Sequence, residues 1–272
     1  MGIRFQGRLG LAAGFDKNAE AVKGLARIGF GFIEVGSVTM RPWKGNPRPR
    51  IQRFESDQAI VNHMGLPSKG VDYVVFRLKN RRPGIPVLGN VAVTPDKAQA
   101  AGNAAAEYRQ TADRLAGVVD AIVLNLSCPN TSEGRSFSSI DGVKTLVRAF
   151  SDWSGPPLLV KFGPSESDQD VSNAVEILLG QGFKGIVATN TMPVDDFKGF
   201  AGGLSGRPLF AQALARVKML RQVCGDGPVI IGCGGVLSRT DFERMREAGA
   251  DLVEILTGLI LKGPALVREI QK

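Results

Sequence analysis

The stretch Ala121-Ile-Val-Leu-Asn-Leu-Ser-Cys-Pro-Asn-Thr131 joins a short apolar run to a group of polar side chains. The apolar run is typical of a buried strand, so Asn125, Ser127, Cys128 and Asn130 are expected at its carboxyl end, where α/β enzymes place their chemistry. Cys128 would there be a proton acceptor between hydrogen-bonding amides. The alternative interpretation is a small buried thiol beside a turn built from asparagines.

Seven further apolar runs resemble this one, and longer amphipathic segments alternate with them. The expected strands are Leu9–Ala13, Phe32–Ser37, Pro86–Val91, Ala121–Leu126, Leu158–Phe162, Gly185–Thr189, Val229–Cys233 and Leu252–Leu256. The expected helices are Ala19–Ile28, Tyr108–Gly117, Gly142–Trp153, Asp170–Gln181, Phe210–Val223, Arg239–Ala248 and Pro264–Gln271. This order predicts a parallel sheet of the α/β class. Eight units without a Gly-x-Gly-x-x-Gly first turn favour a closed (β/α)8 TIM barrel over an open doubly wound sheet.

The length and apolar content are consistent with one domain over residues 1–272, since 43% of the 272 residues are hydrophobic. Residues 40–82 have little regular periodicity and much Pro, Gly, Arg and Asn, which predicts a lid excursion over the C-terminal mouth of the barrel. The sequence contains neither a long apolar span nor a signal peptide, so a soluble, cytoplasmic protein is expected.

Cysteine, histidine and net charge exclude some classes of site and leave others open. The three cysteines are scattered and His63 is the single histidine, so neither a disulfide framework nor a metal site is expected. His63 itself is expected to be a loop or packing residue. The net charge of +8 fits an anionic ligand, an acidic partner, nucleic acid or a membrane surface. In the most basic segment, residues 41–53, Trp43 is the one aromatic residue, which favours a solvated loop over nucleic-acid binding.

Glycine-bearing turns follow the last three expected strands, at residues 202–207, 232–235 and 257–258. Glycine lets backbone N–H groups approach an anion, and the loops after strands seven and eight of such barrels often hold phosphate. A bound phosphoryl group is therefore expected. Ordinary βα loops, in which glycine is common, are the alternative.

Cationic and amide side chains gather at the other strand ends and in the expected lid: Lys17, Asn62, Asn90, Asn125, Lys161 and Asn190. On a barrel, these ends converge. Lys161 lies inside the apolar strand 158–162, where an unpaired ammonium would carry a large desolvation cost. It therefore needs an anionic partner, which is either a ligand or a neighbouring Asp or Glu.

Nine segments, in order along nearly the whole chain, resemble the FMN-dependent dihydroorotate dehydrogenase family. They are Gly10–Asn18, Gly31–Thr39, Asn62–Gly65, Asn125–Thr131, Val160–Lys161, Ala188–Thr191, Gly202–Leu209, Gly232–Gly235 and Leu261–Pro264. The resemblance implies that Cys128 and Lys17 are the catalytic residues in the oxidation of dihydroorotate to orotate, a step of pyrimidine biosynthesis. A hydride would pass to flavin N5 while Cys128 removes a proton from the opposite face. With an ordinary thiol pKa of about 8.5, that role requires a locally favoured thiolate or a coupled transfer.

The resemblance also implies which residues hold cofactor and substrate. FMN would be bound by Ala13, Gly14, Lys17, Ser37, Asn90, Asn125, Lys161, Thr189, Ser205, Gly206, Gly234, Gly235, Leu256 and Thr257. Lys161 would stabilise negative charge at the N1–C2=O edge of the flavin. The planar substrate would be bound by Lys17, Asn62, Met64, Gly65, Asn125, Asn130, Asn190 and Thr191, because amides offer donors and acceptors to an imide edge.

Some segments depart from the family pattern. The body resembles the membrane-associated, quinone-using class, yet that class has serine where this chain has Cys128, and its N-terminal helical extension is expected to be missing here. Residues 66–68 stand where the family usually has an aromatic residue followed by asparagines, and residues 132–135 replace a Pro-Gly turn. A paralogue acting on another dihydropyrimidine or cyclic enone therefore stays open, as does a flavin-binding protein that docks to a redox partner.

The sequence leaves the remaining partners undecided. The electron acceptor is open among quinone, fumarate and oxygen. A homodimer is one expected form of the protein. Peripheral membrane contact is expected if an N-terminal extension was removed.

Overall fold

The computed structural model describes residues 1–80, 83–96, 104–127 and 139–272. Eight parallel strands close into a barrel in the order β1-β12-β11-β8-β7-β6-β5-β2. Their bounds are β1 Leu9–Leu11, β2 Phe32–Val38, β5 Val87–Val91, β6 Ala121–Asn125, β7 Leu158–Phe162, β8 Gly185–Ala188, β11 Val229–Cys233 and β12 Leu252–Ile255. All eight expected strands are confirmed with small shifts at their ends, and the (β/α)8 TIM barrel is confirmed with them.

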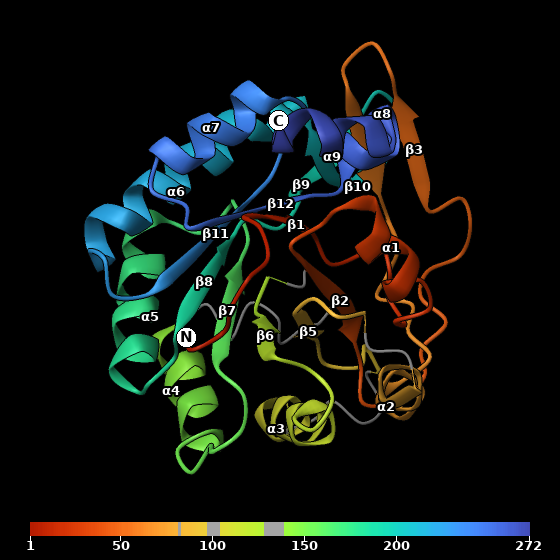
Figure 1. Cartoon of the computed structure of the whole chain (residues 1–272). Coiled ribbons are helices and arrows are strands. Elements are labelled where there is room, and N and C mark those ends of the chain that lie inside the picture. The colour runs from red at the N-terminus through yellow and green to blue at the C-terminus, as the bar shows by residue number, and fades with distance from the viewer. Residues whose placement is uncertain (81–82, 97–103, 128–138) are drawn as a thin grey trace.

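Helices form a ring outside these strands (Figure 1). They are α1 Val22–Ile28, α2 Val71–Asn80, α3 Ala104–Leu115, α4 Ile140–Ala149, α5 Asp168–Gly180, α6 Phe210–Cys224, α7 Arg239–Glu247 and α9 Pro264–Gln271, with the short η1 Arg207–Leu209 and α8 Thr257–Lys262 near the mouth. The seven expected helices are among them. Serine N-caps explain where α5 and α7 begin, since Ser167 Oγ accepts from the Asp170 N–H and Ser238 Oγ from the Asp241 N–H, both at 3.1 Å.

The segment 40–82 contains more regular structure than its composition suggested. Residues 71–80 form α2, which packs beside α3 on the outside of the barrel. Its buried residues Val71, Val74 and Leu78 have helical spacing, a signal that the nearby Pro and Gly residues obscured. The expectation of an irregular excursion is therefore wrong for this helix, while a lid role for the remainder stays a prediction.

The rest of that segment joins a second excursion, after β8, in one small sheet. Strands β3 Ile51–Phe54 and β4 Ala59–Asn62 pair with β10 Phe200–Gly206 and β9 Met192–Phe197 in the antiparallel order β3-β4-β10-β9. The sequence analysis did not predict these strands. Strands β3 and β9 are mostly exposed, and β4, although buried, has only four residues, so none of these three shows a long apolar run. The sheet borders the barrel mouth, because both excursions line the cavity found there.

The barrel interior has two layers of opposite character. The apolar layer, at the amino ends of the strands, comprises Phe32, Leu88, Val123, Leu159, Val187, Ile231 and Leu252. Met1, Ile3 and Phe5 pack against it from below, with the Phe5 and Phe32 rings edge to face at 5.2 Å. Side chains of a strand return to one face every second residue. Two positions later on the same seven strands lies the polar layer, which comprises Glu34, Asn90, Asn125, Lys161, Thr189, Cys233 and Glu254.

Candidate active site at the barrel mouth

A cavity of about 900 Å³ opens above the polar layer at the carboxyl ends of the barrel strands. Clefts of this size at this end are where such barrels bind small molecules. The expected site residues that line it are Ala13, Gly14, Lys17, Ser37, Asn62, Met64, Gly65, Asn90, Asn125, Lys161, Thr189, Asn190, Thr191, Ser205, Gly234, Gly235, Leu256 and Thr257. Gly206 lies just behind the lining, and Cys128 and Asn130 lie outside the described residues.

One end of the cavity is a cradle of glycine backbone. Gly206, Gly234 and Gly235 have φ angles of +93°, +136° and +70°, which L side chains rarely adopt. A Cβ atom on Gly235 would lie 2.6 Å from the Gly206 carbonyl oxygen and 2.7 Å from the Phe210 Cα. The loops after β10 and β11 therefore meet through bare backbone. Beside them, the hydroxyls of Ser205 and Thr257 are 2.8 Å apart and buried. This cradle suits the oxygens of a phosphoryl group.

An ion pair between an exposed arginine and a buried aspartate ties the two glycine loops together. Arg207, next to Gly206, donates from both terminal nitrogens to the two carboxylate oxygens of Asp241 on α7, at 2.9 and 2.8 Å. Asp241 also accepts from the Leu237 N–H at 3.0 Å. Burial alone would raise the pKa of Asp241, but the hydrogen bonds from Arg207 and Leu237 leave it below its usual value. The sequence analysis missed this pair because the two residues belong to different βα units.

Amide and hydroxyl side chains cross the cavity floor in one chain of hydrogen bonds. Asn190 Nδ2 donates to Ser127 Oγ at 2.8 Å, and Ser127 Oγ donates to Asn125 Oδ1 at 2.8 Å. Asn125 Nδ2 in turn donates to Ser37 Oγ at 3.2 Å, and Ser37 Oγ donates to Asn90 Oδ1. The predicted convergence of these amides is confirmed. Ser127, which received no role from the sequence, links them.

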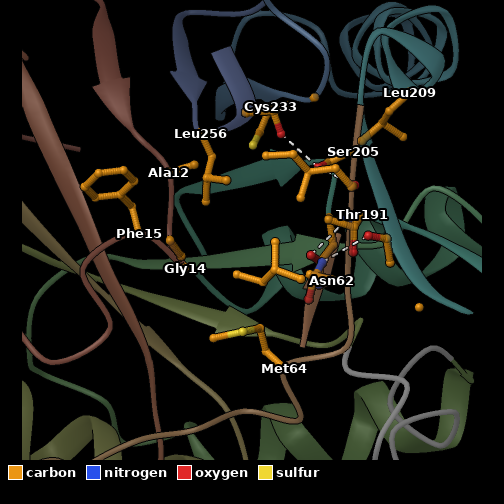
Figure 2. A pocket seen from close by; sticks show the side chains of 18 of the residues that line it. Ala12, Gly14, Phe15, Asn62, Met64, Thr191, Ser205, Leu209, Cys233 and Leu256 are labelled. Carbon is orange, nitrogen blue, oxygen red and sulfur yellow. Dashed lines mark hydrogen bonds between the residues drawn. The ribbon is translucent and has the colours of Figure 1, made fainter. Parts of the chain in front are cut away.

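The antiparallel sheet brings residues from its two excursions to the same side of the cavity. Asn62 at the end of β4 donates from Nδ2 to the Gly203 carbonyl of β10 at 3.1 Å. Figure 2 shows Asn62 and Thr191 side by side, with Met64 farther from the glycine end. His63 beside them is exposed, as expected for a loop residue. The polar groups of this side and those at the end of β6 therefore line the same cavity.

Lys161 lies at the bottom of the cavity with carboxylates on two sides. Its Nζ is 3.5 Å from Glu34 Oε2 and 4.0 Å from Glu254 Oε2, and all three side chains are buried. Burial would lower the pKa of the ammonium, but the charge of Glu34 is the largest effect that raises it, and the pKa lies above its ordinary value. The sequence left either a ligand or a neighbouring Asp or Glu as the anionic partner of Lys161. The structure places two neighbouring glutamates beside it. Both sit inside apolar strands, so the criterion that singled out Lys161 would also have found them.

Cys233, also in the polar layer, holds its proton at neutral pH. Burial raises the pKa of this thiol to about 12, against the opposing effect of the Lys161 ammonium. No group of three or more His, Cys, Asp or Glu side chains suited to a metal ion occurs within the ranges that the structure describes. Across the same ranges, none of the helices has the length and apolarity that crossing a membrane requires.

Fold and site together define a class: a (β/α)8 barrel whose mouth can hold a phosphorylated group at one end and a polar, flat ring at the other. Comparisons with known proteins identify the family. The model of the family described as Dihydroorotate dehydrogenase matches residues 1–272. The chain therefore belongs to the dihydroorotate dehydrogenase family and is an oxidoreductase.

Individual relatives agree with this assignment. The chain is 39% identical to a dihydroorotate dehydrogenase (quinone) from a Nocardioides species, over 99% of this chain and 83% of that protein. It is also 39% identical to a dihydroorotate dehydrogenase (quinone) from Rhodococcus opacus, over 100% and 78%. Among solved structures, ligand-free DHODH from Eimeria tenella superposes with a TM-score of 0.91 at 32% identity, covering 99% of this chain and 84% of that one.

Proposed function

We propose that this protein binds FMN and oxidises dihydroorotate to orotate in pyrimidine biosynthesis. The observation that carries the proposal is the pairing, within one cavity, of a glycine cradle with a buried ammonium: Gly234 and Gly235 at one end and Lys161 at the bottom. A phosphorylated redox cofactor with a flat, polar ring requires both features. The names of the relatives support the substrate.

The residues of the cavity fit FMN. Backbone groups of Gly206, Gly234, Gly235, Leu256 and Thr257 would hold the phosphate, since a Cβ at Gly235 would fill the space between the two loops. The Lys161 ammonium would lie at the N1–C2=O edge of the ring and stabilise negative charge there. Ala13, Gly14, Ser37, Asn90, Thr189 and Ser205 would surround the ring and the ribityl chain. When bound, FMN supplies an acceptor for the electrons that the substrate loses.

The amides at the opposite side fit the substrate. Asn62, Asn125 and Asn190 come from three separate elements and line one cavity, so their donors and acceptors can bracket a planar pyrimidine. Asn130, Met64, Gly65, Thr191 and Lys17 would complete the contacts. Cys128 directly follows Ser127, whose hydroxyl belongs to this network. The Cys128 thiolate would take the substrate proton.

The proposed electron acceptor is a quinone, because the relatives that match over the whole chain are named for it. Phe15 and Ile51 are exposed apolar side chains that line the cavity, which suits an apolar acceptor at its rim. Steady-state turnover with ubiquinone, fumarate and oxygen as alternative acceptors tests this point. Faster turnover with fumarate than with quinone would overturn it.

A second substrate class rests on one observation. Leu66 lines the cavity in a left-handed conformation, within the segment 66–68 that departs from the family pattern. An altered wall at this position suits a ring other than dihydroorotate.

Anaerobic bleaching of the bound flavin distinguishes the proposed function from the second substrate class and from a flavin-binding protein without turnover. Rapid bleaching by dihydroorotate supports the proposed function, and bleaching only by another dihydropyrimidine or another reductant supports the second class. Flavin that binds and is reduced by none of them indicates a flavin-binding protein without this half-reaction. Purified protein that is colourless and does not take up FMN overturns the proposal.

A further inference from the structure

Two glutamates are buried in the polar layer beside a single lysine. Glu34 on β2 and Glu254 on β12 are both 0% exposed, and Lys161 on β7 faces both. Strand β1 lies between β2 and β12, and the residue opposite Glu254 in its register is Gly10. Because Gly10 has no side chain, the Phe32 ring of the apolar layer occupies the space there, 2.2 Å from where a Cβ would lie. Two ionised carboxylates with one ammonium would leave an uncompensated negative charge in the barrel core.

The hydrogen bonds of the two glutamates are unequal. Glu34 Oε1 accepts from Asn90 Nδ2 at 2.5 Å. Glu34 Oε2 and both carboxyl oxygens of Glu254 are buried with no hydrogen-bond partner among the described residues. A buried carboxylate without a donor costs several kcal/mol, so a second charge here is strongly disfavoured. A proton held between the two groups would satisfy an oxygen of each.

We propose that Glu254 is a neutral carboxylic acid that donates its proton to Glu34, so that the pair carries one negative charge and positions the Lys161 ammonium at the edge of the cofactor ring. The proposal rests on the proposed function for its consequence at the cofactor, but not for the protonation itself. Glu254 and Glu34 are positioning residues, since they act through Lys161.

Geometry decides which glutamate carries the proton. Glu34 is closer to the ammonium and has the Asn90 donor, so its ionised form is better stabilised. Glu254 is farther from Lys161 and has neither advantage. Burial and then the charge of Glu34 raise the pKa of Glu254 well above its usual value. From β11, the neighbouring strand, the other titratable group is Cys233, which is neutral.

The consequence is a balanced charge at the cavity floor. One carboxylate and one ammonium leave the cluster neutral, so the ammonium is fixed in place without an excess negative charge that would oppose electron transfer to the ring above. A second ionised carboxylate at this depth would disfavour the reduced cofactor, because charges a few ångströms apart interact strongly in a protein interior. The pair is therefore expected to set the reduction potential of the bound flavin.

Infrared spectroscopy of the purified full-length chain tests the protonation without reference to the flavin. At neutral pH the wild type is expected to show the C=O stretch of a protonated carboxyl group. Both Glu34→Gln and Glu254→Gln should abolish it, because the remaining glutamate then ionises beside Lys161. Glu247→Gln, at an exposed position on α7, is the matched control and should retain the band. A wild type without the band, or a band that survives Glu34→Gln, overturns the proposal.

The reduction potential of the bound flavin tests the positioning. Each single variant keeps one negative charge beside Lys161 and should leave the potential close to that of the wild type. The double variant removes that charge and should favour reduced over oxidised flavin by about tenfold or more, which is ~30 mV for a two-electron couple. A change in reduction potential that appears only in the double variant is expected if the two glutamates share one proton. A clear rise in either single variant overturns the proposal, and this criterion holds even if the double variant does not fold. Failure of the wild type to bind flavin would refute the proposed function and leave the infrared result to decide the proton.

Discussion

The two layers inside the barrel are built on the same strands and differ in position by two residues. On β7, Leu159 lies in the apolar layer and Lys161 in the polar layer, and on β12 the same relation holds for Leu252 and Glu254. The apolar layer is sealed below by the N-terminal residues, whereas the polar layer forms the floor of an open cavity. A shift of two residues along each strand therefore separates the apolar layer, which stabilises the fold, from the polar layer, which forms the cavity floor.

Truncation in the apolar layer should have the largest effect on stability. Leu159 is fully buried in this layer, so Leu159→Ala is expected to lower the free energy of unfolding by about 2–5 kcal/mol through lost burial and a cavity. Urea denaturation measures the change. Leu159→Met, which nearly conserves volume, should cost less than about 1.5 kcal/mol. An altered flavin potential in a folded Leu159→Ala protein would contradict the separation of the layers.

Replacing the proposed base, Cys128, should change the rate of flavin reduction and not the stability of the fold. Cys128→Ala is expected to leave FMN bound and stability little changed, yet to slow flavin reduction by dihydroorotate about 10²-fold or more, as loss of a positioned base does. Stopped-flow measurement of anaerobic bleaching gives the rate. Cys224→Ala, far along the chain at the end of α6, is the control. Unchanged reduction by the Cys128 variant would remove this thiol from the mechanism.

Substitutions in the glycine cradle should weaken the binding of FMN. Gly235→Ala places a Cβ against backbone at a positive φ, so flavin is expected to bind about tenfold more weakly, equivalent to ~1.4 kcal/mol. Gly117→Ala is a matched control, because a Cβ there meets nothing within 4 Å. Fluorescence titration of apoprotein with FMN measures both. Equal affinities for the two variants would refute the phosphate assignment.

The pH dependence of stability tests the polar layer most directly. The pKa of Glu254 is raised from 4.5 by burial and by Glu34, so the folded state keeps a proton that the unfolded state releases. Its stabilising contribution is thus full below pH 4.5 and is lost as the pH rises toward the folded-state pKa. Glu254→Gln should remove this decline, at most ~1.4 kcal/mol per pH unit. Denaturation curves that stay parallel between wild type and variant from acidic to neutral pH would disprove the raised pKa.

Sequence reasoning worked where the signal was local and strong. Apolar runs identified all eight barrel strands, and glycines marked the turns that form the cradle. It failed for α2, whose flanking residues resemble a loop, and for the sheet of β3, β4, β9 and β10, whose strands become stable only by pairing across the mouth. Glu34 and Glu254 received no role although each interrupts an apolar strand, because no single strand shows which charged residue on another strand lies beside it.

The sequence by itself determined the barrel, the polar positions on its strands and the family, because strand periodicity and motif order are properties of consecutive residues. Only the tertiary structure decided which polar residues meet. Closure of the barrel sets β1 between β2 and β12, and this contact brings Glu34 and Glu254 to one lysine from opposite ends of the chain. The physical reason is that charge balance and desolvation depend on distance in space, which no local pattern encodes.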